Sequence, residues 1–324
     1  LPTVMSALSS SVPGVRPSAL AALGKLGDAS SIMPLAEAAA VPGAGQAEAR
    51  RSLSMLRASG ADAAIVSALG AAKGRVKAEL ITASGERAAS SAAPALAQAA
   101  RDPDREVLRA ALRALRTVGG TAEVEPLLNL VLNAASATDR REASQALAAV
   151  LRRSDPAPVG AVISAFHNAP ARPARLSLLE VMGQTSSQEA LPVLRKSAND
   201  ADAEIARGAI LALSEWDDPA PLADLLALAK AAPREAPGSE PAQTRRRWDE
   251  PPPTNNLQVL ALRGILKLMV LRSERTPAES ARLLGDVMAL STQTPEKAAV
   301  LSLLPYFPSK EALEVARAAL RDTS

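Results

Sequence analysis

A run of arginines beside a tryptophan is the strongest candidate binding motif in this chain. It consists of Arg245, Arg246, Arg247 and Trp248. Guanidinium groups clamp carboxylates or phosphates, and the indole ring offers a stacking surface. The motif lies in a stretch with six prolines between residues 233 and 253, which excludes a regular helix. We therefore expect a long loop. It either contacts a partner or, in the favoured interpretation, folds over the rest of the molecule with its arginines solvated.

A second set of arginines occurs at equivalent positions in different copies of an internal repeat. Its members are Arg109, Arg141 and Arg207. Together they could engage an acidic partner. They could instead belong to an internal ladder, in which Arg109 and Arg207 pair with Asp102 and Asp200, each seven residues earlier. The ladder is the favoured interpretation, because surface ion pairs of this kind are common and individually weak.

The residue types that most catalytic and metal sites require are scarce. The chain has one histidine, His167, and no cysteine, which excludes disulfides, cysteine nucleophiles and two-histidine metal sites. Glycine pairs lack the Lys–Ser/Thr that completes a phosphate loop, and paired carboxylates such as Asp217 and Asp218 fall at turns, where they cap helices. We therefore expect no catalytic residue, no metal ligand, no cofactor and no small-molecule substrate.

Six prolines each stand 21 residues before a large apolar residue, and this pairing defines the repeat. The pairs are Pro2/Leu23, Pro34/Met55, Pro94/Leu115, Pro126/Leu147, Pro158/Leu179 and Pro192/Leu213. Each proline opens an apolar stretch of helical spacing, here named helix A, and each second residue lies in a second such stretch, helix B. Turns rich in Asp separate the two helices and supply N-caps. Glycines follow helix B, where a left-handed cap would end it: Gly27, Gly60, Gly85, Gly119 and Gly183. Stacked hairpins of this length form a solenoid.

Several B segments resemble the second helix of a HEAT repeat. They are Val15–Gly27, Asp102–Leu115 and Asp200–Leu213. The resemblance covers nearly the whole chain. It implies an all-α fold, a right-handed α–α superhelix of about nine helical hairpins whose B helices line the concave surface. HEAT-like hydroxylases bind iron through several His–Glu pairs, so the single histidine excludes that family. The scarcity of tyrosine and tryptophan argues against the HEAT-like glycosylases that bind DNA.

The repeat predicts a single HEAT-like solenoid over residues 1–324. Its repeats are expected near 1–27, 28–60, 61–86, 87–119, 120–151, 152–183, 184–217, 218–272, 273–305 and, in part, 306–324. The repeat at 61–86 is short, and the repeat at 218–272 holds an insertion over 233–256. A final helix over 311–321 has no partner, so we expect the chain to be a fragment of a larger polypeptide.

Composition narrows the function. The net charge of +3 is too small to indicate nucleic-acid binding without a concentrated patch, and no apolar run is long enough to span a membrane. We predict a non-catalytic scaffold or adaptor that binds a protein partner or a fused domain through the concave face.

The C-terminal third leaves an alternative open. Asn256–Leu268, Thr294–Leu303 and Ser309–Leu313 resemble HEAT-type segments of multidomain secreted proteins from planctomycete-like bacteria. In those proteins such segments accompany sugar-processing domains, which implies an accessory module of a larger exported enzyme. A lyase-type HEAT protein acting on a chromophore–protein conjugate is a weaker alternative. The compartment stays open, with export slightly favoured over the cytoplasm.

Overall fold

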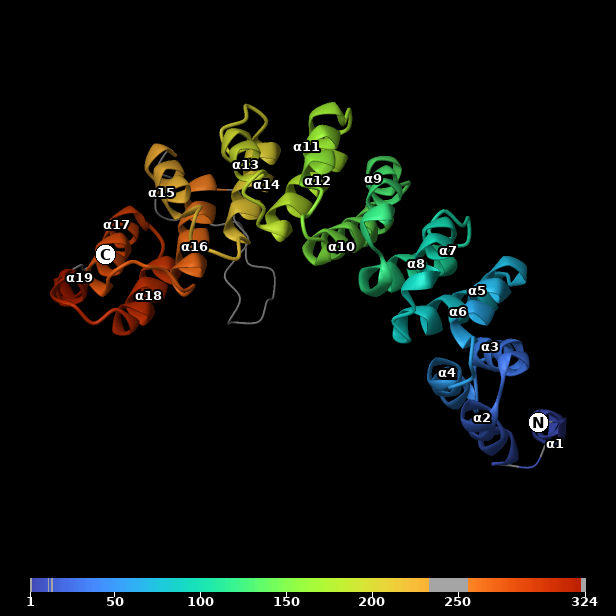
Figure 1. The fold of residues 1–324 in the computed structure, drawn as a ribbon. Coiled ribbons are helices and arrows are strands. Elements are labelled where there is room, and N and C mark those ends of the chain that lie inside the picture. Colours follow the sequence, from blue (N-terminus) through green and yellow to red (C-terminus); the bar gives the residue numbers. More distant parts are fainter. Residues whose placement is uncertain (1, 11, 13, 233–255, 322–324) are drawn as a thin grey trace. The chain divides into compact units, whose positions relative to one another are not determined.

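The structure, a computed structural model, describes residues 2–10, 12, 14–232 and 256–321. Within these residues it contains 19 α-helices and five short 3-10 segments and no strand, which confirms the all-α prediction (Figure 1). None of the described helices is both long and apolar enough to cross a lipid bilayer. The chain divides into two compact units, unit 1 over Leu1–Pro158 and unit 2 over Val159–Ser324.

Unit 1 is a stack of helical hairpins. Its A helices are α1 (Pro2–Ser6), α3 (Ile32–Ala40), α5 (Ala61–Ala71), α7 (Ala93–Ala99) and α9 (Val124–Asn133). Its B helices are α2 (Val15–Leu26), α4 (Gln46–Met55), α6 (Gly74–Glu86), α8 (Arg105–Val118) and α10 (Ala137–Arg153). Each B helix packs on its hairpin partner, and successive B helices of the unit pack on one another, as α8 does on α7, α6 and α10, so the core lies between two layers (Figure 1).

Unit 2 repeats this arrangement. Its A helices are α11 (Val159–Asn168), α13 (Leu191–Ser197), α15 (Leu222–Ala231), α17 (Pro277–Leu290) and α19 (Lys310–Arg321). Its B helices are α12 (Arg172–Thr185), α14 (Ala203–Ser214), α16 (Leu257–Met269) and α18 (Thr294–Leu303). Residues 233–255 of the expected insertion lie outside the described residues, and Arg245, Arg246, Arg247 and Trp248 lie there with them.

The large apolar residues that follow the prolines by 21 positions lie in the core, with one exception. Five of the six are completely buried: Leu23, Leu115, Leu147, Leu179 and Leu213. Met55 is instead 59% exposed, because its neighbours Leu53 and Leu56 occupy the core in its place. Met55 is therefore not equivalent to the five leucines with which the repeat aligns it, and its thioether lies at the surface.

Aspartates cap two of the B helices, α8 and α14, as expected. Asp104 accepts a hydrogen bond from the backbone N–H of Glu106 at 2.9 Å, and Asp202 accepts one from Glu204 at 3.0 Å. These bonds satisfy N–H groups that the first turn of a helix leaves without a partner. The same turn chemistry therefore starts α8 in unit 1 and α14 in unit 2.

The glycines near the ends of the B helices do not act as expected. Of the five, only Gly60 has a left-handed φ, of 72°. Gly85 and Gly183 lie inside α6 and α12, where a Cβ would come within 3.0 Å and 2.8 Å of the Cβ atoms of Ala114 and Ala212 in the next B helix. At these two positions glycine permits close helix packing, and it does not end the helix.

Candidate functional site

The two helical layers of unit 1 differ in charge. The five B helices described in unit 1 carry 14 lysines and arginines against six acidic residues, a balance of +8. The five A helices described there carry three acidic residues and no lysine or arginine. In the described helices of unit 2 the balances are +3 for the B helices and +2 for the A helices. The small net charge of the chain therefore conceals one basic layer.

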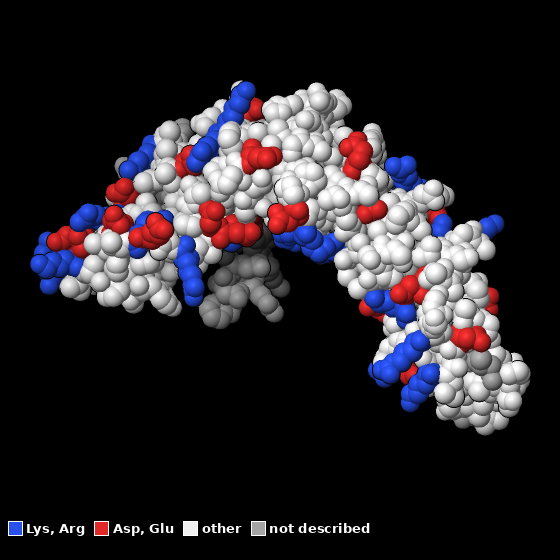
Figure 2. Space-filling view, in the orientation of Figure 1, with Lys and Arg blue, Asp and Glu red and all other residues white. Residues whose placement is uncertain are grey.

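Helix α8 shows how the sequence places these charges. Its apolar residues recur on one side and are buried, among them Val107, Ala111 and Leu115. Four arginines recur every three or four residues on the other side: Arg105, Arg109, Arg113 and Arg116. Figure 2 shows basic side chains gathered along the side of unit 1 on which α4 and α10 lie. We call the exposed side of α2, α4, α6, α8 and α10 the basic face.

Part of this charge is neutralised between successive hairpins. A cation in one B helix pairs with an acid 29 to 33 residues later, in or just before the next B helix of the same unit. The pairs are Arg50–Glu79, Arg75–Glu106, Arg109–Asp139, Arg172–Asp202 and Arg263–Glu296, at 2.5–3.6 Å. Ion pairs therefore link neighbouring hairpins in register, in both units.

The expected ion pairs within one hairpin are wrong. Asp102 is bound not by Arg109 but by Lys77 of the preceding B helix, at 2.7 Å, and Asp200 is bound by Arg175 at 3.6 Å. Seven residues of helix rise about 10 Å, whereas the adjacent B helix runs alongside at every turn. The acids at these turns consequently meet cations of the preceding hairpin.

The three arginines at equivalent repeat positions have different surroundings and do not form one site. Arg109 is bound to Asp139. The Nε atom of Arg207 is buried and has no hydrogen-bond partner among the described residues. Arg141 is exposed and forms no ion pair with any described residue, and the same holds for Arg51 and Arg113. We call Arg51, Arg113 and Arg141 the open arginines; they lie on α4, α8 and α10.

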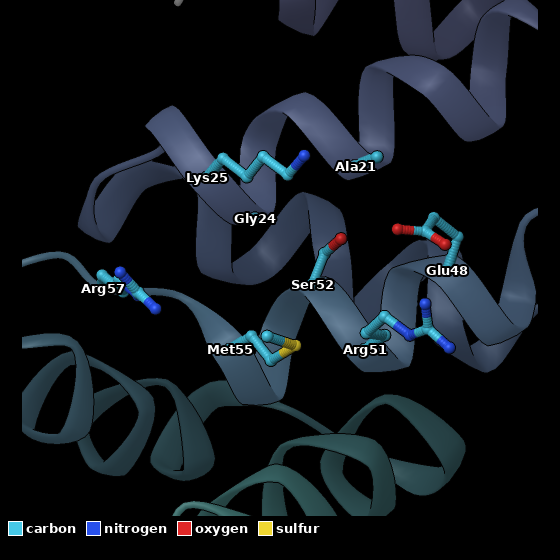
Figure 3. A pocket seen from close by; sticks show the side chains of 8 residues that line it. All are labelled: Ala21, Gly24, Lys25, Glu48, Arg51, Ser52, Met55 and Arg57. Carbon is cyan, nitrogen blue, oxygen red and sulfur yellow. The ribbon is translucent and has the colours of Figure 1, made fainter.

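A pocket of about 540 Å³ opens between α2 and α4 on the basic face (Figure 3). The two helices cross closely there, since a Cβ on Gly24 would lie 2.7 Å from the Cβ of Ser52. The pocket is lined by three cations, one acid and the exposed thioether, namely Lys25, Arg51, Arg57, Glu48 and Met55. Methionine adapts its shape to apolar groups. The pocket can therefore take an apolar side chain while its rim attracts carboxylates.

Sequence reasoning missed this pocket because it treated Met55 as equivalent to the leucines of the repeat, which are buried. It also missed the basic layer, because the net charge was taken over the whole chain. One signal was available, since no lysine or arginine falls in the five A helices of unit 1. Counting charge separately for the A and B segments would have revealed the contrast.

His167, the one histidine of the chain, lies exposed near the end of α11. Its Nδ1 is 2.9 Å from the backbone oxygen of Ile163, and its ring packs edge-on against Phe166, with 5.6 Å between the centroids. The described residues contain no group of three His, Asp or Glu side chains that could hold a metal ion.

Comparison with known proteins gives one family match. A family model described as HEAT repeats matches residues 63–148 and 159–236, together just over half of the 324 residues. Two curated proteins, urocortin from Rattus norvegicus and from Mus musculus, are each 45% identical over 62 residues, or 19% of this chain. The chain spans half the length of these two relatives.

Three solved structures are similar at low identity. The complex of CpcE and CpcF of phycocyanin lyase from Nostoc sp. PCC7120 is 16% identical over 89% of this chain and 93% of that chain, with a TM-score of 0.33. Computationally designed armadillo repeat proteins for modular peptide recognition are 18% identical over 67% and 99%, with a TM-score of 0.36. Human deoxyhypusine hydroxylase is 17% identical over 92% and 97%, with a TM-score of 0.32. These TM-scores are too low to carry an argument about function.

Proposed function

This chain belongs to the HEAT-repeat family, and we propose that it is a non-catalytic scaffold that binds an acidic segment of a protein partner on its basic face. The observation that carries the proposal is the charge contrast between the layers of unit 1, +8 on the B helices against three acids on the A helices. A surface of one sign steers an oppositely charged partner and fixes its register.

The ion pairs between hairpins determine which cations remain for a partner. Arg50 and Arg109 are held by Glu79 and Asp139, so their charge is already compensated. The open arginines have no such acid among the described residues, and each stands on a different B helix. A partner that contacts all three therefore has to run across α4, α8 and α10, which an extended acidic segment can do.

The pocket at α2 and α4 adds a requirement for shape. Met55 offers an apolar contact, and Lys25, Arg51 and Arg57 surround it (Figure 3). An acidic segment with one apolar side chain fits both features, because burying that side chain provides binding energy that exposed charges alone do not.

Nucleic acid fits the basic face less well than a protein does. Residues 1–158 contain no phenylalanine, tyrosine or tryptophan, so the face has no ring on which a base could stack. Contacts to phosphates alone would give binding without base or sequence preference.

Selection of displayed random peptides on the immobilised chain tests the proposal. We expect enrichment of peptides rich in Asp and Glu with an apolar residue between them. Replacing the open arginines together, Arg51→Glu, Arg113→Glu and Arg141→Glu, removes three attractive contacts and adds repulsion. Affinity for a selected peptide, measured by fluorescence anisotropy, should fall about tenfold or more, and binding by the unaltered chain should weaken with added salt.

The matched control carries the same charge change elsewhere. Lys73→Glu, Arg101→Glu and Lys196→Glu alter three exposed cations outside the basic face, in the turns before α6 and α8 and in α13. This variant should bind the selected peptide like the unaltered chain. Equal loss in both variants would mean that overall charge, not the face, governs binding. Binding of an oligonucleotide but of no acidic peptide would refute the proposed partner class.

A further inference from the structure

The guanidinium group of Arg275, in unit 2, is partly buried and has no hydrogen-bond or ion-pair partner among the described residues. Its Nε and Nη2 atoms are shielded from solvent and make no hydrogen bond with any described residue. Burial lowers the pKa of Arg275, yet an arginine side chain stays protonated at neutral pH. A positive charge in such surroundings is costly unless an anion compensates it.

The acid best placed to compensate Arg275 is already engaged. Glu279 attracts Arg275 through space, but the two do not form an ion pair among the described contacts. The Oε2 atom of Glu279 instead accepts from the backbone N–H of Thr276 at 2.8 Å and from its hydroxyl at 2.9 Å, completing a capping box for α17. Moving Glu279 toward Arg275 would give up this cap.

Arg275 lines a pocket of about 540 Å³. One wall is apolar and consists of Met269 at the end of α16, Leu303 at the end of α18 and Phe307. The polar groups beside it are Arg272, Ser273 and the exposed Tyr306. The Nη1 atom of Arg275 likewise makes no hydrogen bond with a described residue. Unlike Nε and Nη2, it is not shielded from solvent, so an oxygen atom that enters the pocket can reach it. The volume is that of a site for a small organic molecule.

We propose that this pocket binds an organic carboxylate that carries an apolar body. The carboxylate would accept from Nη1 of Arg275, and Arg272 would add a second positive charge. The apolar body would lie against Met269, Leu303 and Phe307. A free organic acid and the C-terminal residue of a peptide share this chemistry, and the experiment distinguishes the two.

Isothermal titration calorimetry on the full chain tests the proposal with matched ligands. The probes are 4-phenylbutyrate and its neutral amide, and an acetylated peptide ending in leucine with a free or an amidated C-terminus. We expect at least one carboxylate to bind about tenfold or more tightly than its amide, the scale of one hydrogen bond to a charged group. Preference for phenylbutyrate identifies a free acid, and preference for the peptide identifies a chain terminus. Equal binding of acid and amide, or no binding of any probe, would overturn the proposal.

Arg275→Met separates binding from folding. Methionine retains the apolar stem and removes the uncompensated charge, so the variant should unfold at a midpoint no lower than that of the unaltered chain while losing carboxylate binding. Arg317→Met, at an exposed arginine of α19, is the control and should bind like the unaltered chain. A clearly lowered midpoint for Arg275→Met would show that the guanidinium has a structural role, and retained binding would show that it does not hold the ligand. Either result overturns the proposal.

Discussion

Asp139, near the start of α10, joins two hairpins. Its carboxylate accepts from the hydroxyl of Ser136 at 2.6 Å and from Nε of Arg109 in α8 at 3.3 Å. The hydrogen bond from Ser136, and then the one from Arg109, hold the pKa of Asp139 below its usual value. The side chain of Asp139 is 9% exposed, so these bonds are little screened by water.

Asp139→Asn should therefore destabilise the protein in a pH-dependent way. A lowered folded-state pKa contributes stability above the ordinary value, about pH 4, and this contribution is lost as the pH falls through the folded value. At neutral pH the variant should lose about 1.5 kcal/mol of unfolding free energy, the scale of a hydrogen bond to a charged group. The difference should narrow toward pH 3, as measured by urea unfolding at several pH values. Glu125→Gln, at an exposed glutamate of α9, should show neither effect; an Asp139→Asn deficit that is constant with pH would contradict the argument.

Individual residues were predictable from the sequence where the governing interaction is local. Asp104 and Asp202 cap helices through bonds that span two residues, so the turn sequence alone predicts them. Arg109 and Met55 were not predictable. The partner of Arg109 stands 30 residues away, and the exposure of Met55 depends on which side of α4 meets the core.

At the level of helices, close crossings between B helices depend on glycine. A Cβ on Gly183 in α12 would lie 2.6 Å from the backbone oxygen of Ala212 and 2.8 Å from its Cβ, both in α14. Backbone atoms cannot move aside as a flexible side chain can, so the two helices would have to separate.

Gly183→Ala should lower the free energy of unfolding by about 1–3 kcal/mol, because overpacking exceeds the gain in helix propensity. Gly70→Ala in α5 is the matched substitution, since a Cβ there would meet no atom within 4 Å. It should raise the free energy of unfolding by about 0.5–1 kcal/mol, the cost of glycine inside a helix. Chemical denaturation of both variants measures the two changes. A stabilising Gly183→Ala would mean that α12 and α14 are not held at this distance.

The helices themselves were largely predictable, since proline, Asp turns and apolar spacing act within one hairpin. The final helix expected over 311–321 is α19, Lys310–Arg321, and the repeat expected over 218–272 ends with α16, Leu257–Met269, after its insertion. The role of Gly85 and Gly183 was not predictable. A glycine near a helix end suits a left-handed cap and a close crossing equally, and only the neighbouring helix distinguishes them.

On the scale of the whole molecule, stability should be local, because each hairpin packs mainly on its neighbours. Leu115 in α8 is completely buried, and α8 packs against α6, α7 and α10. In a repeat array the free energy is close to a sum of hairpin terms and nearest-neighbour terms. A defect in α8 should therefore weaken the helices beside it and leave distant hairpins unchanged.

Leu115→Ala and Leu213→Ala form a matched pair for this prediction, one in each unit. Both remove a completely buried leucine from a B helix and should cost about 2–5 kcal/mol locally. Hydrogen exchange followed by mass spectrometry should show lost protection in α6, α8 and α10 for Leu115→Ala, with α14 and α16 unchanged. For Leu213→Ala the losses should fall in α12, α14 and α16. If either substitution lowered protection equally throughout both units, the chain would unfold as one cooperative body, and the nearest-neighbour account would be wrong.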